Sequence, residues 1–298
     1  MIYVRLAGGL GNQLFQTAAA LLLAASEERQ IVLVPNGLTK YASVRGLDIA
    51  RLLDFGKIKQ LSIASENSLG AALIDKLRIG RWLPFLSVTD AKFSRLCGDG
   101  RSMPSLLFLD GYYQSGWDVK ELLRIADIIK AAIPHSGGQE PRDGDVIGVH
   151  VRGGDFLNVP LHKVVDEKYY FHAIKDLIEV QGAGRELCCI TDDPDYARAV
   201  LRYSVARFGL QFSAIERPSS DLLDDFRRLG AFRFCVIGNS TFSFWGYLLG
   251  SGPLSARVLV SPKQFTNKRD RDFLLPGEVL LDAKNEWRRT SLAEENGL

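Results

Sequence analysis

A histidine and an arginine stand at the end of an apolar run in the segment DVIGVHVRGGDF. Side chains alternate along a strand, so His150 and Arg152 share one of its faces. A central parallel strand is normally apolar because helices cover both faces, and a charged group at its carboxyl end needs a charged partner. Asp155 either supplies that partner, in an ion pair that fixes the loop, or faces a ligand together with Arg152.

Two carboxylates, Asp192 and Asp193, follow the next apolar run, ELCCIT. Either of them can cap the helix that Pro194 begins. The spacing of Asp193 and Asp195 also leaves a divalent metal site open, although Asp195 would lie within the helix and no further oxygen ligands are evident. In the interpretation that we favour, Asp192 and Asp193 contact the base or ribose of a nucleotide.

A third polar segment lies in FCVIGNSTFSFWGYLLG, which predicts a buried strand, a short turn and an aromatic helix. Ser240 or Thr241 can cap this helix. Hydroxyl and N–H groups at a helix N-terminus also form a phosphate site. A cation, carboxylates and a hydroxyl-rich helix start at three strand ends together predict a site for a nucleotide diphosphate.

The N-terminal stretch GGLGNQ is a glycine turn between a predicted strand and helix, as in dinucleotide-binding domains. That fingerprint requires a third glycine and an acidic residue about 20 positions later. Leu14 occupies the third glycine position, and the next strand, IVLVPNG, ends without Asp or Glu, which excludes this class. Asn12 and Gln13 remain at the start of a helix, where they accompany an anion site or, alternatively, form a tight turn with an Asn cap.

A length of 298 residues is long for one core and favours two domains. With 46% hydrophobic and 24% charged residues, the composition is ordinary for a soluble globular protein. The net charge of +2 and the lack of a long basic run give no reason to expect a nucleic-acid partner. No apolar run reaches membrane-span length and Met1 leads directly into a strand, so we expect a cytoplasmic protein. The four cysteines have neither metal spacing nor disulfide-scaffold density: Cys97, Cys188, Cys189 and Cys235.

Strands and helices alternate on both sides of PHSGGQEPRDGD, a segment rich in Gly, Pro and charge that predicts a domain boundary. The pattern therefore predicts two doubly wound α/β domains, 1–135 and 146–298, with a cleft between them. Residues 36–105 give a weaker pattern, in which LDIARLLDF and LIDKLRIGRWL are helices or loops. The clearer predicted strands are 2–6, 31–34, 146–152, 186–191, 234–239 and 257–261, and the clearer helices are 12–26, 118–133, 168–180, 194–204, 220–232 and 241–250.

The chain resembles the bacterial α-1,2-fucosyltransferases of glycosyltransferase family 11 in five motifs that occur in order over nearly its whole length: GGLGNQLFQ, LDGYYQS, VHVRGGDF, ITDDPDYA and GNSTFSFWGYLL. GxxGNQ and the His-x-Arg motif are also similar to those of protein O-fucosyltransferases, which implies GDP-β-L-fucose as the common donor. The resemblance implies a GT-B-like fold, with the donor bound by the C-terminal domain and the acceptor by the N-terminal one.

The resemblance also implies roles for individual residues. Arg152 would bind the diphosphate, and His150 and Asp155 would take part in donor binding or loop geometry. Asn12 and Gln13 would reach the donor across the cleft. The nucleoside would meet Asp192 and Asp193, and the phosphate turn would comprise Asn239, Ser240, Thr241 and Ser243.

The implied reaction is inverting transfer of L-fucose from GDP-β-L-fucose to the 2-hydroxyl of a galactose unit in an oligosaccharide or surface polysaccharide precursor. Arg152 and Asp155 are the predicted catalytic residues, and no metal or cofactor is expected, because Arg152 and helix N–H groups would stabilise the departing diphosphate. A transferase with another nucleotide-sugar donor, or a non-catalytic nucleotide-sugar-binding protein, is the alternative. A lipid-linked acceptor would bring the protein to the inner face of the membrane.

The sequence departs from the family pattern in three places. Gly153 replaces the second of two adjacent arginines, which removes one positive charge near the expected diphosphate. The pair Phe244-Trp245 stands where the family has two tryptophans, and Gly116 with Trp117 replaces polar residues on the expected acceptor side. Gly153 therefore bears most directly on the affinity for the donor and on its identity.

Overall fold

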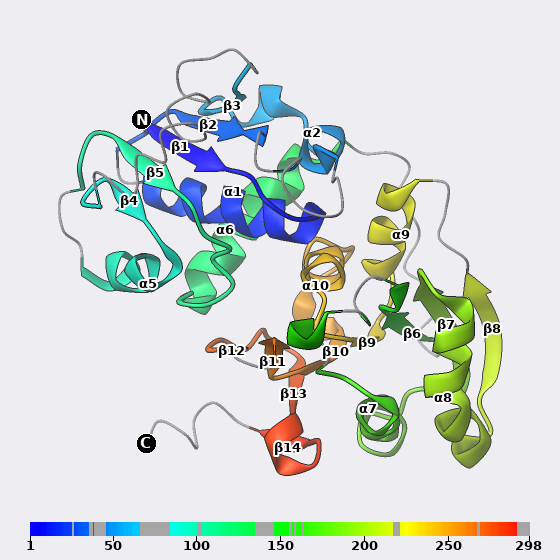
Figure 1. The fold of residues 1–298 in the computed structure, drawn as a ribbon. Helices are drawn as coiled ribbons and strands as arrows, with labels where there is room; N and C mark the ends of the chain where they lie inside the picture. Colours follow the sequence, from blue (N-terminus) through cyan, green and yellow to red (C-terminus); the bar gives the residue numbers. More distant parts are fainter. Residues whose placement is uncertain are drawn as a thin grey trace. The chain divides into compact units, whose positions relative to one another are not determined.

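The chain consists of two compact units in a computed structural model, Met1–Ser136 and Gly137–Leu298 (Figure 1). The structure describes residues 1–25, 27–35, 38, 46–65, 84–99, 103–134, 146–154, 157, 159–162, 164–216, 221–266 and 269–290. Asp155, the segment LIDKLRIGRWL and most of the predicted boundary segment lie outside the described residues.

The first unit is a parallel sheet of five strands in the order β3-β2-β1-β5-β4. β1 lies between β2 and β5, which is where the strand order reverses, so the carboxyl ends of β1 and β5 form the topological switch point of this sheet (Figure 1). Helix α1 packs against β1 and α6. The strands are β1 Ile2–Arg5, β2 Ile31–Val34, β3 Leu61–Ile63, β4 Ser87–Val88 and β5 Leu107–Leu109; the helices are α1 Leu10–Ala24, α2 Asp48–Leu52, α5 Asp90–Asp99, α6 Val119–Ala132 and the short η2 Phe55–Lys57.

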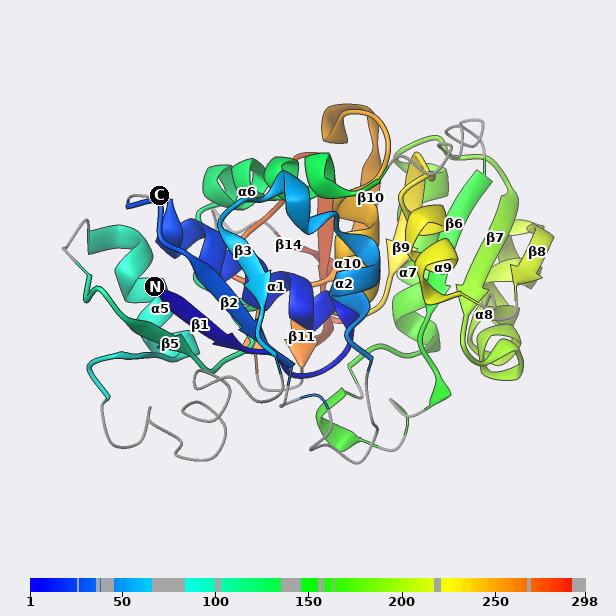
Figure 2. The same cartoon turned by 90° about the horizontal axis from the view of Figure 1, so that it is seen from above.

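The second unit contains a seven-stranded sheet in the order β14-β13-β10-β9-β6-β7-β8. Its neighbouring strands are parallel except for the edge pair β13 and β14. Figure 2 shows β6 between β9 and β7, where the strand order reverses. The strands are β6 Val146–Val151, β7 Glu186–Thr191, β8 Gln211–Glu216, β9 Phe234–Ile237, β10 Val258–Pro262, β13 Glu278–Asp282 and β14 Arg288–Thr290, with a separate antiparallel pair, β11 Gln264–Thr266 and β12 Arg269–Asp270.

Aspartates cap three of the helices that connect these strands, α7, α8 and α9. Asp166 accepts a hydrogen bond from the Tyr169 N–H at the start of α7, and Asp221 accepts one from Leu223 at the start of α9. Gly209 ends α8 in the left-handed conformation, with φ of 62°. The helices are α7 Glu167–Glu179, α8 Pro194–Phe208, α9 Leu222–Leu229 and α10 Thr241–Leu248, with the short η4 Pro160–His162, η5 Leu254–Ala256 and η6 Ala283–Asn285.

The central strand β6 is apolar apart from His150 and is buried after its first residue, as the sequence predicts for a parallel strand that helices cover on both faces. Close packing requires glycine at position 148, because a Cβ atom there would lie 2.3 Å from a ring carbon of Phe232. A larger residue would therefore displace the ring from this face of the sheet.

The predicted GT-B-like α/β fold class is confirmed, because each of the two units is built on a largely parallel sheet. The strands predicted at 31–34 and 186–191 are confirmed residue for residue, and the helix predicted at 12–26 is shifted two residues towards the N-terminus. Several strands are not predicted: β3, β4, β8, β11, β12, β13 and β14. In the described part of the chain, none of the helices has both the length and the apolar character that crossing a bilayer requires.

Candidate functional site

The predicted polar residues of the second unit gather at one edge of its sheet. Arg152 follows β6, Asp192 follows β7, and the turn at residues 239–240 follows β9. β6 pairs in parallel with both neighbours, so that Val151 lies opposite Thr191 and His150 lies opposite Ile237. The carboxyl ends of all three strands therefore meet at the switch point, where open α/β sheets bind their ligands (Figure 2).

The carboxylate of Asp192 holds the loop that follows β6. Its Oδ2 lies 2.8 Å from Nη1 of Arg152, and its Oδ1 accepts a hydrogen bond of 2.7 Å from the backbone N–H of Gly153. The side chains of Arg152 and Asp192 are only 26% and 24% exposed. Arg152 thus has Asp192 as an ion-pair partner. Asp155 itself lies outside the described residues.

Asp193 caps α8, as the simpler alternative predicted. Its Oδ1 accepts a 3.0 Å hydrogen bond from the Tyr196 N–H, and its backbone N–H donates to the Thr191 hydroxyl at 3.0 Å. A Cβ atom at Gly153 would lie 2.5 Å from the Cβ of Asp193. This close approach gives a physical reason for glycine where the family pattern has a second arginine.

The alternative metal site gains no third ligand from the described residues. The Asp195 side chain is 97% exposed and pairs with Arg198 at 2.8 Å, while the carboxylate of Asp193 is engaged at the helix start. Within the described ranges, no group of three or more His, Cys, Asp or Glu side chains is placed to hold a metal ion. The carboxylates of Asp192 and Asp193 orient protein groups.

His150 lies at the same edge as a neutral imidazole. Its side chain is 4% exposed, and burial, followed by the nearby charge of Arg152, lowers the pKa of His150 to about 3. Its Nδ1 is buried without a hydrogen-bond partner in the described structure, and its ring centroid lies 6.0 Å from that of Phe242 in α10. His150 therefore provides neither positive charge nor an effective base at neutral pH.

The first turn of α10 begins without a side-chain cap. Ser240 occupies the N-cap position, yet its hydroxyl makes no capping hydrogen bond, whereas Ser243 donates to the Ser240 carbonyl at 3.0 Å. Asn239 donates to the carbonyl oxygens of His162 and Phe265, at 3.1 Å and 3.0 Å. The side chains of Asn239 and Ser243 thus hold the turn, and the helix start presents backbone N–H groups and the positive end of its dipole.

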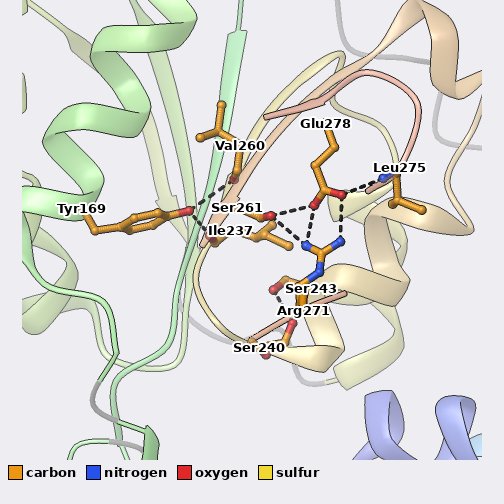
Figure 3. Close-up of polar contacts among 9 residues, drawn as sticks. All are labelled: Tyr169, Ile237, Ser240, Ser243, Val260, Ser261, Arg271, Leu275 and Glu278. Carbon is orange, nitrogen blue, oxygen red and sulfur yellow. Dashed lines mark hydrogen bonds and ion pairs between the residues drawn. The ribbon is translucent and has the colours of Figure 1, made fainter. Parts of the chain in front are cut away.

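A buried ion pair that the sequence analysis did not predict lies beside this turn (Figure 3). Arg271 Nη2 lies 2.7 Å from Glu278 Oε2, and Nη1 donates to the Ser261 hydroxyl at 2.8 Å. Glu278 also accepts the backbone N–H of Leu275 at 2.9 Å. The side chains of Arg271 and Glu278 are 1% and 0% exposed, so each charge depends on the other for compensation.

The Arg271 guanidinium also faces three aromatic rings. Its central carbon lies 5.0 Å, 5.3 Å and 4.7 Å from the centroids of Phe244, Phe265 and Phe273. Phe244 belongs to α10, so this cation–π cluster joins the helix to the segment between β10 and β13. Tyr169 of α7 reaches the same layer, donating hydrogen bonds to the carbonyl oxygens of Ile237 and Val260 (Figure 3).

In the first unit, the two predicted amides have different environments. Gln13 is fully buried, and its Nε2 donates to the carbonyl oxygens of Gly8 and Gly46 while its Oε1 accepts from the Ile49 N–H. Asn12 is partly buried, and its Oδ1 accepts a 2.9 Å hydrogen bond from Gln114. The predicted Asn cap is wrong, because Gly9 is the N-cap of α1.

Two glycosyltransferases and one solved structure are similar to this chain over most of its length. The chain is 23% identical over 304 residues to the O-antigen biosynthesis glycosyltransferase WbnK of Escherichia coli, covering 89% of this chain and 94% of that protein. It is 22% identical over 275 residues to an alpha-1,2-colitosyltransferase of Escherichia coli, covering 88% and 92%. A structure of an FUT1 variant of Arabidopsis thaliana in complex with GDP has a TM-score of 0.54 at 13% identity, covering 84% of this chain and 68% of that one, which is a likeness of fold.

A family model also matches this chain over residues 90–274, a stretch that includes the carboxyl edge of the second sheet from Arg152 to α10. The model is described as glycosyl transferase family 11 and covers more than half of the sequence. With the two E. coli glycosyltransferases similar over most of its length, this chain belongs to glycosyl transferase family 11.

Proposed function

We propose that this glycosyltransferase transfers L-fucose, with inversion, from GDP-β-L-fucose to the 2-hydroxyl of a galactose unit in a surface glycan precursor. The observation that carries the donor site is the arrangement of Arg152, oriented by Asp192, at the same sheet edge as the start of α10. A guanidinium and helix N–H groups are the usual partners of a diphosphate. The fold likeness to a GDP-bound FUT1 variant supports a guanine nucleotide as the carrier.

The departing diphosphate sets the main electrostatic demand of the reaction. Breaking the bond between the sugar and the phosphate places growing negative charge on the phosphate oxygen and oxocarbenium-like charge on the sugar. Arg152 and the N–H groups at Ser240 and Thr241 stabilise the departing charge without reorganising. The nucleotide base does not require Asp192 in this proposal, because both oxygens of that carboxylate already accept hydrogen bonds from the loop.

The acceptor hydroxyl loses a proton as it attacks the sugar. Asp155 is one candidate base and a phosphate oxygen of the donor is the other, whereas the low pKa of His150, about 3, makes that residue a poor base. Activity of the Asp155→Asn variant separates these candidates. A loss of kcat with unchanged donor binding would identify Asp155, and wild-type kcat would favour the phosphate oxygen.

A second donor is supported by the likeness to the alpha-1,2-colitosyltransferase. Colitose is L-fucose without its 3-hydroxyl, so the two donors differ in one polar group. Parallel assays with GDP-fucose and GDP-colitose on the same galactoside separate the two proposals. The donor with the higher kcat/KM is the one that the site fits.

Calorimetric titration tests the proposed donor site. The wild type and Arg152→Ala are each titrated with GDP-fucose, GDP, UDP and NAD in EDTA. Tight binding of the guanine ligands to the wild type alone, without a metal, is the expected result. Binding of UDP in their place would overturn the guanine assignment. In a separate rate assay, a loss of activity in EDTA would overturn metal-free transfer.

A lipid-linked galactoside in vesicles tests the proposed membrane association. The protein should sediment only with vesicles that carry this galactoside.

A further inference from the structure

The loop between β5 and α6 in the first unit has an unusual backbone. Tyr113 adopts a left-handed conformation, with φ of 53°, although it is a bulky residue without glycine's freedom. Such conformations persist only where the surroundings hold them, and they occur often at binding sites. The loop follows β5 and therefore lies beside the switch point of the first sheet.

Three groups hold Tyr113 in this conformation. The carboxylate of Asp90 accepts a 2.6 Å hydrogen bond from its N–H, and the Trp117 indole donates to its carbonyl oxygen at 2.7 Å. Its own hydroxyl donates to the Val88 carbonyl at 2.5 Å. The rings of Tyr113 and Trp117 pack edge-on against Phe93, with centroids 5.3 Å and 5.0 Å away. Trp117, which departs from the family pattern, is thus part of the buried support.

The loop delivers Gln114 to the start of α1. Gln114 Nε2 donates a hydrogen bond of 2.9 Å to Oδ1 of Asn12, which lies in the first turn of α1 after β1. The two amides join the chain segments that follow β1 and β5. They therefore lie at the switch point of the five-stranded sheet, the edge at which such sheets bind ligands.

Two other glutamines of this unit show what a purely structural amide looks like here. Gln13 is 0% exposed and Gln16 is 1% exposed, and both ends of each amide are engaged by backbone groups. Gln114 is partly exposed, and in the described part of the chain its Oε1 accepts no hydrogen bond. Asn12 fixes one end of this amide, and the other end is open to a ligand that donates a hydrogen bond.

We propose that Gln114 binds a hydroxyl group of a sugar substrate, which donates a hydrogen bond to its Oε1 atom. The proposal rests on the proposed function only in taking a sugar as the ligand. A fixed amide suits this task, because a sugar hydroxyl meets an oxygen that is already oriented and loses little rotamer freedom on binding. Both the acceptor glycan and the donor sugar carry such hydroxyls, and the kinetic test distinguishes them.

The test compares Gln114→Ala with the control Gln30→Ala. Gln30 is an exposed glutamine that immediately precedes β2, so it lies at the amino ends of the strands, away from the switch point at their carboxyl ends. Loss of one neutral hydrogen bond should raise the KM of one substrate about fivefold in Gln114→Ala and leave Gln30→Ala unchanged. A higher KM for the galactoside assigns the contact to the acceptor, and a higher KM for GDP-fucose assigns it to the donor.

Single deoxy derivatives of the affected sugar separate a direct contact from a loosened loop. If Gln114 binds one hydroxyl, the wild type should bind the derivative that lacks it about fivefold more weakly, and Gln114→Ala should bind both sugars equally. The proposal is overturned if Gln114→Ala has an unchanged KM for both substrates. It is also overturned if Gln114→Ala still discriminates against every deoxy derivative as the wild type does.

If the proposed transfer reaction is not observed, sugar binding at Gln114 can still be measured directly by NMR. Glutamine-selective nitrogen-15 labelling makes the side-chain amide signals of glutamine visible by NMR, and the signal that is absent in Gln114→Ala belongs to Gln114. This signal is followed while galactosides, GDP-fucose and GDP-colitose are added. A shift in that signal with any of these sugars, but not with GDP, supports the contact even without turnover. No shift with any of them overturns it.

Discussion

Asp192 binds the guanidinium of Arg152 and the backbone N–H of Gly153 at once, with contacts of 2.8 Å and 2.7 Å. The two contacts fix both the direction of the cation and the path of the loop that carries it. An isolated arginine at a strand end would sample many rotamers. The pair instead presents one charge in one place, which is what stabilising a departing diphosphate requires.

Replacing Asp192 by Asn should lower kcat/KM by about 10- to 100-fold, because Asn still accepts the Gly153 N–H but loses the charge that orients Arg152. Arg152→Ala should lower it by about 100-fold or more. Asp195→Asn is the matched control, since that side chain is 97% exposed and pairs with Arg198. Initial-rate kinetics with GDP-fucose measure all three, and wild-type kcat/KM in Asp192→Asn would contradict the positioning role.

Gly153→Ala should destabilise the protein by about 1 to 3 kcal/mol, because the added Cβ would lie 2.5 Å from the Cβ of Asp193. The effect should shrink when Asp193→Gly removes the opposing atom, so the two substitutions should not be additive. Urea unfolding of the two single variants and the double variant measures this coupling. Additive free energies would mean that the cost of Gly153→Ala does not arise from its approach to Asp193.

His150 should make the folded state sensitive to acid. Its pKa is lowered from 6.5 to about 3, so between these pH values the unfolded chain binds a proton that the folded chain does not. Stability therefore falls as the pH drops below 6.5, by about 2 kcal/mol between pH 7 and pH 5. His150→Gln should remove this part of the loss.

The matched control for that pH effect is His172→Gln. The pKa of His172 is also lowered by burial, but its side chain lies nearer the surface, so this variant should keep most of the acid sensitivity of the wild type. Urea unfolding at pH 7 and pH 5 gives the comparison. An equal loss of stability in the wild type and in His150→Gln would refute the assignment.

Breaking the buried pair of Arg271 and Glu278 should be costly. Arg271→Met leaves the Glu278 charge uncompensated in the interior and should destabilise the protein by about 3 to 5 kcal/mol. The double variant Arg271→Met with Glu278→Leu removes both charges and should recover much of that stability. Thermal unfolding measures the series, and a double variant less stable than Arg271→Met would contradict this account.

The sequence predicts the central elements well because parallel strands are continuous apolar runs and polar residues interrupt them only at their ends. This places Arg152, Asp192 and the turn before α10 correctly. The partner of Arg152 is harder to predict, because alternation tells which residues share a face but not which carboxylate of a neighbouring loop reaches across. Asp192 is distant in sequence, whereas Asp155 is close.

Other parts of the site resemble ordinary surface or core in the sequence. RDRDF carries charges of both signs and is typical of a solvated segment, yet Arg271 within it is buried beside Glu278. Gln13 and Gln114 are the same residue type in equally polar motifs, and only their burial distinguishes a residue that holds loops from one that faces a ligand. Such distinctions arise from tertiary packing, which local patterns do not encode.

The enclosure of Arg271 by one carboxylate and three phenylalanine rings also makes it a natural reporter. Its guanidinium protons are shielded from water, so they should exchange with deuterium only when the second unit opens. Their exchange rate would therefore report the opening free energy beside α10 in the absence of any substrate. A ligand that rigidifies the α10 turn would slow that exchange from a distance, without touching the arginine.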